Sequence, residues 1–91
     1  MSREKTIFMP MGHFLREQRE SAGLNQTEVA EVLNVKPQFV SNWERGKSCV
    51  PLRMARKVCT LYGLPRETFV AKSIEFYKAF VKTELGLRGT A

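Results

Sequence analysis

A chain of 91 residues ordinarily forms one compact domain, and this length leaves little room for a second core or an enclosed catalytic cleft. Hydrophobic residues make up 43% and charged residues 26%, a balance typical of a globular protein. Fifteen Lys and Arg exceed nine Asp and Glu by a net charge of +6, which favours a polyanionic partner such as nucleic acid, although a solvated basic face would have the same charge.

A flexible arm over residues 1–10 is predicted before the first helix, because the chain begins with polar and charged residues that show no period. Arg3 and Lys5 would extend from this arm towards phosphates, or the terminus would simply fray. Pro10 interrupts the apolar stretch from Ile7 to Met11. No apolar run approaches the roughly 20 residues that cross a bilayer, so no transmembrane helix and no membrane partner are predicted.

The first helix is predicted from Met11 to Ala22. Met11, Leu15 and Ala22 lie at helical spacing, mostly polar side chains fill the other positions, and Gly23 supplies a natural stop. The single histidine, His13, lies on this helix and is interpreted as a surface or capping side chain.

Asn25 opens a second predicted helix. Glu28 follows three residues later, so that each side chain can accept a hydrogen bond from the backbone N–H of the other residue in a capping box. The apolar residues that come next are Val29, Ala30, Val32 and Leu33. The helix is predicted to end near Leu33, since Asn34 suits the left-handed conformation of a tight turn.

A third, short helix is predicted from Pro37 to Arg45. Proline is best tolerated in the first turn, where its missing N–H would have had no intrahelical partner. Gly46 is a natural C-terminal stop, and Arg45 is well placed at the negative end of the helix dipole. Val40 and Trp43 are three residues apart and can face the core together.

Two further helices complete an all-α fold. Pro51 begins the fourth and Gly63 ends it. The apolar stripe of this helix consists of Met54, Val58, Leu61 and Tyr62. Pro65 begins the fifth, which extends to about Leu85. A polar, glycine-containing flexible tail is expected over residues 86–91.

The segment from Leu15 to Gly63 resembles the lambda-repressor-like, Cro-type (XRE) DNA-binding domain. It matches in LREQRESAGLNQTEVAEVL, then NVKPQFVSNWERGK, then a proline-started helix that ends LYG. The matched positions at fixed intervals are Arg19, Gly23, Leu24, Gln26, Glu28, Ala30, Val40, Ser41, Trp43, Glu44, Gly46 and Lys47. The resemblance implies a five-helix helix-turn-helix domain over residues 11–85, whose extended C-terminal helix, residues 65–85, serves core and dimer packing. It also implies a transcriptional regulator that binds double-stranded DNA and needs no cofactor, and the two cysteines, expected to be reduced thiols, favour the cytoplasm.

In this motif the first residues of the third helix reach base edges in the major groove. The resemblance assigns base contacts to Lys36, Pro37, Gln38, Ser41 and Asn42. Gln38 is the first choice, because an amide donates and accepts at once and so matches adenine N6 and N7, and Asn42 shares this chemistry. Lys36 would donate to guanine and replaces the small hydroxyl cap common in the family, while Pro37 offers only apolar contact. Phe39 either contacts a thymine methyl or packs between the second and third helices.

The resemblance also assigns supporting roles. Arg19 and Glu44 occupy the positions of a salt bridge that holds the recognition helix at a fixed angle, the alternative being two independent surface charges. Gln26, in the first turn of the second helix, would contact phosphate and brace the first recognition-helix side chain. Arg45 and Lys47 would contact further phosphates or remain solvated surface charges.

The last predicted helix carries more apolar surface than its own core requires. Phe69, Phe76 and Phe80 form one stripe on a helical wheel. An adjacent stripe consists of Val70, Ile74, Tyr77, Val81 and Leu85. This surplus favours a homodimer, the alternative being a deeply packed final helix. A homodimer that follows the family would act as a repressor on a roughly palindromic operator with half-sites ~34 Å apart.

Other classes of function fit the sequence less well. A single His, no cysteine nucleophile paired with it and no phosphate-binding glycine loop argue against an enzyme. Cys49 and Cys59 lack partners at zinc-ligand spacing, so reduced thiols and no metal site are expected. RNA binding lacks a stacking platform on a sheet. An antitoxin, or another protein-binding module that retains the same scaffold and grips a toxin with residues 65–85, stays open as the alternative.

Overall fold

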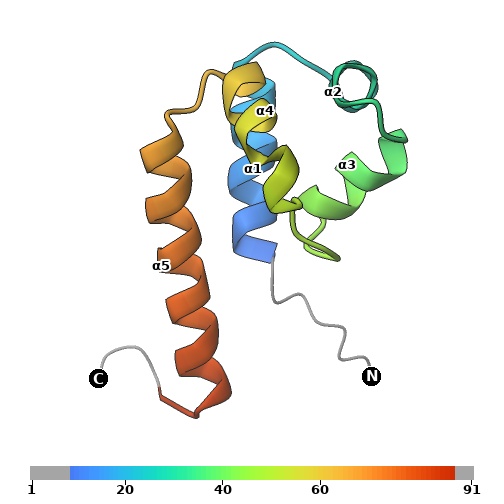
Figure 1. Ribbon diagram of the computed structural model, residues 1–91. Helices are drawn as coiled ribbons and strands as arrows, with labels where there is room; N and C mark the ends of the chain where they lie inside the picture. Colours follow the sequence, from blue (N-terminus) through green and yellow to red (C-terminus); the bar gives the residue numbers. More distant parts are fainter. Residues whose placement is uncertain (1–8, 88–91) are drawn as a thin grey trace.

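The computed structural model describes residues 9–87, and within them every regular element is an α-helix (Figure 1). The helices are α1 Met9–Ser21, α2 Gln26–Leu33, α3 Pro37–Glu44, α4 Leu52–Tyr62 and α5 Arg66–Glu84. The expected all-α, five-helix fold is therefore confirmed. Residues 1–8, with Arg3 and Lys5 of the expected arm, and residues 88–91 of the expected tail lie outside the described residues.

The first helix begins earlier than the sequence suggests. α1 starts at Met9, two residues before the predicted start at Met11. Pro10, expected to interrupt the apolar stretch, occupies the first turn of α1, where its missing N–H needs no intrahelical acceptor. The predicted boundary of the arm at residue 10 is therefore wrong by two residues.

Local hydrogen bonds set the bounds of α2. The Asn25 side chain accepts a hydrogen bond of 2.8 Å from the Glu28 N–H, and the Glu28 carboxylate accepts one of 2.8 Å from the Asn25 N–H. After the last turn, Asn34 adopts the left-handed conformation with a φ of 59°. The capping box and the Asn34 turn are both confirmed, and together they define the short loop that leads into α3.

α3 has the predicted start, but that start lacks a side-chain cap. Pro37 is its first residue, and Lys36 in the N-cap position makes no side-chain hydrogen bond to the helix. At the other end α3 stops at Glu44, with Arg45 as its C-cap. The chain then turns at Gly46, whose φ of 75° is readily adopted only by glycine.

The hydrophobic core lies where α1 to α4 meet. Val29, Val40 and Val58, from three different helices, are its largest fully buried side chains. The other buried apolar residues are Leu15, Ala30, Leu33, Trp43, Val50, Cys59, Tyr62 and Leu64. Val40 and Trp43 therefore face the core from α3, as predicted. Val32 does not join the core and is 58% exposed, because it lies outside the helical face that Val29 and its buried neighbours on α2 define.

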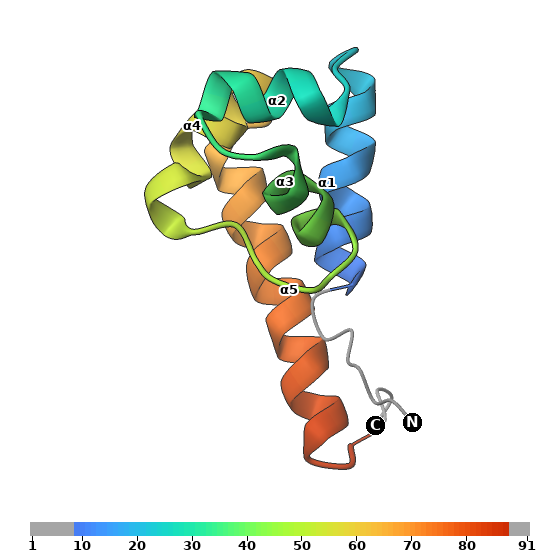
Figure 2. The ribbon, with the colours of Figure 1, turned by 90° about the vertical axis from the view of Figure 1, so that its right-hand side faces the viewer.

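α5 lies beside α1 and extends beyond the rest of the domain (Figures 1 and 2). None of its residues is fully buried. Its contact with α1 includes the rings of Phe14 and Phe76, whose centroids are 6.4 Å apart, and Lys72 Nζ lies 5.6 Å from the centre of the Phe14 ring. The alternative of a deeply packed final helix is therefore excluded for the described residues.

α1 and the end of α3 meet backbone to backbone at Gly12. A Cβ atom at this position would lie 2.5 Å from the carbonyl oxygen of Glu44 and 2.7 Å from that of Trp43. No carbon atom can approach a carbonyl oxygen so closely without a shift of one helix. Gly12 therefore sets the separation between α1 and the C-terminal end of α3, which the sequence pattern alone does not indicate.

We predict that Gly12→Ala destabilises the fold. Helix propensity alone would raise the free energy of unfolding by about 1 kcal/mol. Overpacking costs about 1–3 kcal/mol, and contact with backbone atoms, which cannot move aside as a side chain can, favours the upper end, so the net effect is a loss of up to about 2 kcal/mol. Urea unfolding followed by circular dichroism measures this difference. His13→Ala, at the exposed neighbouring position, serves as the control and should change stability by less than about 0.5 kcal/mol. A stabilised Gly12→Ala variant would contradict the close contact.

Candidate nucleic-acid interface

α3 has a buried face and an exposed face. Val40, Trp43 and Glu44 are buried against the other helices. The exposed residues at and around α3 are Lys36, Pro37, Gln38, Phe39, Arg45 and Lys47, while Ser41 and Asn42 are half-buried. The residues expected to contact bases therefore lie together on or beside the outer face of one short helix. Phe39 is 49% exposed, so its ring is neither enclosed between α2 and α3 nor fully in solvent.

A buried ion pair joins α1 to the end of α3. Arg19 Nε donates to Glu44 Oε2 at 2.6 Å, and Arg19 Nη2 donates to Glu44 Oε1 at 3.0 Å. The two residues are 7% and 5% exposed, so they are not independent surface charges. The hydrogen bonds that Arg19 donates to the Glu44 carboxylate raise the pKa of Arg19 above its ordinary value. Such a two-point contact defines the orientation of both side chains as well as their distance.

Two further hydrogen bonds complete this cluster. Arg19 Nη1 donates to the Leu24 carbonyl at 2.8 Å, which ties the loop between α1 and α2 to the pair. Gln26 Nε2 donates to Glu44 Oε1 at 2.9 Å. Gln26 therefore braces the last residue of α3, and not the first recognition-helix side chain that the resemblance implies.

Tyr62 of α4 lies within the electrostatic reach of the pair. Burial, together with the Glu44 carboxylate, raises the pKa of its hydroxyl to about 12, and the nearby Arg19 lowers it only in part. Every buried side-chain nitrogen and oxygen in residues 9–87 has a hydrogen-bond partner. The cluster is thus fully satisfied, which is the condition for a charge to be tolerated inside a small domain.

On the exposed face, three polar side chains form a hydrogen-bonded row along α3. Gln38 Nε2 donates to Asn42 Oδ1 at 3.1 Å, and Arg45 Nη2 donates to the same Asn42 oxygen at 3.1 Å. The family resemblance implies base contacts for Gln38 and Asn42 and a phosphate contact for Arg45, but it does not indicate that the three side chains touch. Their spacing of four and three residues is the available signal, because such positions are neighbours on a helix.

The predicted cations lie at both ends of α3. Lys36 precedes its first turn and Lys47 follows its last, and both side chains are exposed. The Lys47 N–H donates to the Asn42 carbonyl at 2.9 Å, so the backbone that carries this lysine is fixed to α3. An anionic ligand laid across the exposed face of α3 would meet positive charge on either side of the amide row.

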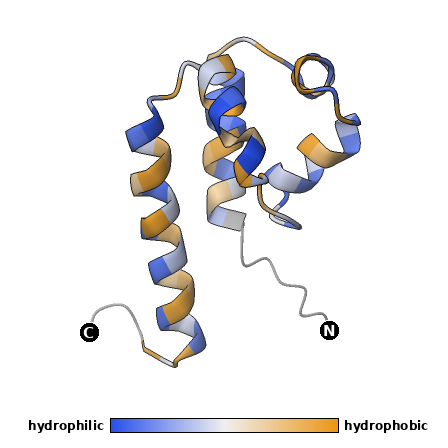
Figure 3. Ribbon diagram, in the orientation of Figure 1, coloured by the Kyte–Doolittle hydropathy of each residue, from blue (hydrophilic) through white to orange (hydrophobic). Residues whose placement is uncertain are grey.

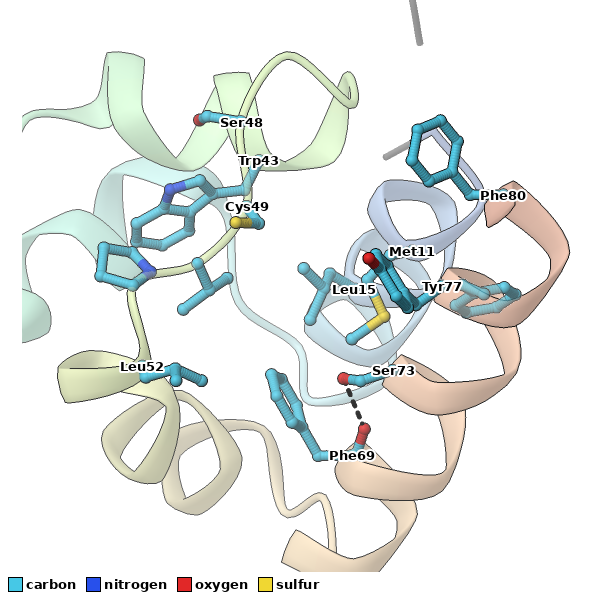
Figure 4. A pocket seen from close by; sticks show the side chains of 13 residues that line it. Met11, Leu15, Trp43, Ser48, Cys49, Leu52, Phe69, Ser73, Tyr77 and Phe80 are labelled. Atoms are coloured by element: carbon cyan, nitrogen blue, oxygen red, sulfur yellow. Dashed lines mark hydrogen bonds between the residues drawn. The ribbon is translucent and has the colours of Figure 1, made fainter. Parts of the chain in front are cut away.

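The residues expected to form a dimer interface lie along α5. Val70, Ile74, Tyr77 and Leu85 are between 55% and 70% exposed, and Val81 is half-buried. Figure 3 shows that apolar residues recur along the whole length of this helix. Tyr77 also borders a cavity of about 310 Å³ between α5 and the segment that joins α3 to α4 (Figure 4). The walls of this cavity include Trp43, Leu52 and Phe80, and Tyr77 is the residue that belongs both to the cavity and to the exposed stripe of α5.

Within residues 9–87 no group of three or more His, Cys, Asp or Glu is arranged to hold a metal ion. Cys49 is exposed, Cys59 is buried, and both are free thiols. In the same part of the chain no helix has both the length and the apolar character that crossing a membrane requires.

We predict that Glu44→Gln is strongly destabilising. The substitution removes the close counter-charge of the buried Arg19 guanidinium and leaves only the exposed Glu20 carboxylate, 3.9 Å from Arg19 Nη2, which should cost about 3–5 kcal/mol in the free energy of unfolding. Glu75→Gln removes the exposed pair in which Lys72 Nζ lies 3.6 Å from the Glu75 carboxylate. This control should change stability by less than about 1 kcal/mol. Urea unfolding of both variants tests the difference, and equal effects would contradict the role assigned to the buried pair.

Comparison with known proteins identifies the family. A family model described as helix-turn-helix matches residues 15–69. The chain is 32% identical over 71 residues to a Pyrococcus furiosus protein named as an HTH-type transcriptional regulatory protein, a match that covers 78% of this chain and 21% of that protein. A protein of the same description from Thermococcus kodakarensis is 30% identical over 77 residues, which cover 85% of this chain and 23% of the relative. No solved structure gives a significant match.

The chain spans about a fifth of the length of the curated relatives that it matches. Residues 15–69, which the family model matches, include the buried pair of Arg19 and Glu44 and the exposed face of α3. This chain belongs to the XRE-type helix-turn-helix family of transcriptional regulators.

Proposed function

We propose that the chain is a sequence-specific, double-stranded-DNA-binding transcriptional regulator that inserts the exposed face of α3 into the major groove. The observation that carries this proposal is that α3 has two different faces. Its buried face is held through Glu44, and its exposed face carries the row of Gln38, Asn42 and Arg45. A reading helix needs both properties, because base contacts require side chains presented at a defined angle. The net charge of +6 supports a polyanionic ligand.

Residues on the exposed face of α3 and at its N-terminal end would contact the bases. Gln38 is the main reader, with Asn42 beside it and Ser41 at the edge of the contact. Lys36 would donate to guanine O6 and N7, and Pro37 would offer apolar contact to a thymine methyl. Both Lys36 and Pro37 are exposed at the start of the helix, which supports these contacts.

Phosphates would be contacted on both sides of the reading face. Lys47 and Arg45 follow the last turn of α3, and Gln26 lies in the first turn of α2, which crosses the backbone in this motif. The amide nitrogen of Gln26 already donates to Glu44, so its contribution to phosphate would come from the adjoining N-terminal turn of α2 as much as from its side chain. Bound in this way at a promoter, the domain would act in the cytoplasm as a repressor by covering the DNA.

We further propose that the regulator is a homodimer that pairs through the outer side of α5 and binds a palindromic operator. The exposed residues Val70, Ile74, Tyr77 and Leu85 support this, because monomeric proteins rarely expose a continuous apolar stripe of this length. A two-fold dimer would also double the number of bases that one short helix can contact. The same stripe is what favours the second candidate, a protein-binding module such as an antitoxin.

Substitutions of phosphate-contacting and base-contacting residues should affect DNA binding in different ways. Lys47→Ala should weaken binding to all sequences and reduce the slope of log affinity against log salt concentration by about 1, because one phosphate contact is lost. Gln38→Ala should lower discrimination at one base pair by about 1–3 kcal/mol with little change in that slope. Titrations of selected and unrelated duplexes at several salt concentrations measure both effects. If Gln38→Ala changes neither affinity nor base preference, Gln38 is not the main reader.

Dimerisation should depend on the outer side of α5. The unmodified chain should sediment as a dimer at micromolar concentration, and Ile74→Glu should sediment as a monomer because it places a charge in the stripe. Ala79→Glu adds the same charge at an exposed position of α5 well away from the stripe and should leave the dimer intact. An unmodified chain that is monomeric with and without DNA would overturn the homodimer. Stoichiometric capture of a different protein from the native host, sensitive to Ile74→Glu, would instead support the protein-binding module.

A further inference from the structure

The side-chain oxygen of Asn42 has no hydrogen-bonding capacity left for a ligand. An amide oxygen offers two lone pairs, and here Gln38 Nε2 and Arg45 Nη2 each donate to Asn42 Oδ1 at 3.1 Å. What remains of the Asn42 amide is its NH2 group, with two hydrogen atoms. Asn42 therefore presents donors only.

Gln38 is left in a different state. It uses one hydrogen of its NH2 group on Asn42, which leaves its Oε1 and the other hydrogen without a partner in the hydrogen bonds of this row. Gln38 can thus still donate and accept at the same time. The two amides, which are chemically alike in the sequence, become unlike readers once the row has formed.

Arg45 determines the direction of this row. A guanidinium group carries N–H donors and no acceptor, so the Asn42 amide must turn its oxygen towards Arg45. The flipped amide would set its NH2 group against the guanidinium N–H groups. Since Asn42 Oδ1 then also faces Gln38, the amide of Gln38 has to offer its nitrogen. The other N–H groups of Arg45 are not engaged by Asn42, so that a phosphate contact is compatible with this role.

We propose that Arg45 is a positioning residue for base reading, which makes Asn42 a donor-only reader and leaves Gln38 able to both donate and accept. This inference rests on the proposed function of α3. A donor-only group is best matched by guanine, whose O6 and N7 both accept, whereas adenine and cytosine each present an amino donor in the major groove. Gln38 matches adenine, whose N6 donates and whose N7 accepts.

These contacts lie on an exposed face, and their effect is expected where water is displaced. In the free protein a solvated amide exchanges hydrogen bonds with water at little cost. Inside the groove an amide turned the wrong way faces a base donor with its own donor, and the mismatch is left unpaired. The orientation set by Arg45 is therefore measurable as base preference and need not affect folding stability.

The test is selection of binding sites from a random duplex library, with sequencing, by the full chain and four variants. Asn42→Ala identifies the base pair that Asn42 contacts. Arg45→Gln replaces a donor-only group by one that also accepts, whereas Arg45→Lys keeps the charge and the donor-only character. Lys47→Gln is the matched control, since it removes one exposed cation that makes no side-chain contact with the row.

We expect the unmodified chain to select guanine at the pair identified by Asn42→Ala. Arg45→Gln should reduce the preference for guanine over adenine there by about tenfold, the value of one well-formed base contact. Arg45→Lys should keep the preference for guanine. Lys47→Gln should lower the affinity for all sequences and leave the preference for guanine unchanged. Circular dichroism of each variant checks that the helices are retained.

Different results overturn different statements. If the unmodified chain enriches no sequence, the proposed function fails and this inference falls with it. If a sequence is enriched but Asn42→Ala alters no position, or Arg45→Gln leaves the guanine preference intact, only the inference fails. Loss of the preference in Arg45→Lys to the same degree as in Arg45→Gln would also overturn it, because lysine shares the property on which the argument depends.

Discussion

The carboxylate of Glu44 is the group on which the arrangement of α1, α2 and α3 depends. It accepts hydrogen bonds from Arg19 twice and from Gln26 once, so three donors from two other helices converge on the last residue of α3. A buried carboxylate is costly unless its charge is balanced and its lone pairs are used. The fold meets that condition only when the three helices stand in one relative position. The main contribution of the pair is therefore to fix the relative positions of the three helices, rather than to raise the free energy of unfolding above that of an apolar replacement.

A steric constraint acts on the same point. Gly12 lets α1 approach the carbonyl oxygens of Trp43 and Glu44, so that the polar cluster and the backbone contact both fix the C-terminal end of α3. The start of this helix has no side-chain cap at Lys36 and is held instead by Val40, whose side chain is fully buried in the core. α3 is thus fixed at both ends through its buried face, while the residues proposed to meet bases are exposed.

The sequence predicts the local features of this fold well and the contacts between helices poorly. The capping box of Asn25 and Glu28, the left-handed turn at Asn34 and the proline-started α3 depend on residues a few positions apart, which a pattern reveals. The sequence gives no sign of the close contact at Gly12, because the atoms that this residue meets belong to α3. Pro10 appears to interrupt the apolar stretch, because a proline in the first turn of a helix has the same local pattern as a proline that breaks one. The family resemblance indicated the pairing of Arg19 with Glu44. It did not indicate that Gln26 joins them or that Arg45 occupies the Asn42 oxygen, because both depend on rotamers.

The absence of any buried residue in α5 bears on how the helix is maintained. Most of the stability of a helix in a protein comes from tertiary packing, and the part of α5 that extends beyond α1 has little of it to add to its own backbone hydrogen bonds. Its helical order is then coupled to whatever covers its apolar side. If a second copy of the chain covers this side, the folding of the end of α5 and the formation of the dimer become one equilibrium. Occupancy of the DNA would then rise more steeply than in proportion to the concentration of the chain in the cell. A small change in synthesis or degradation would then act as a sharp control of the regulated promoter.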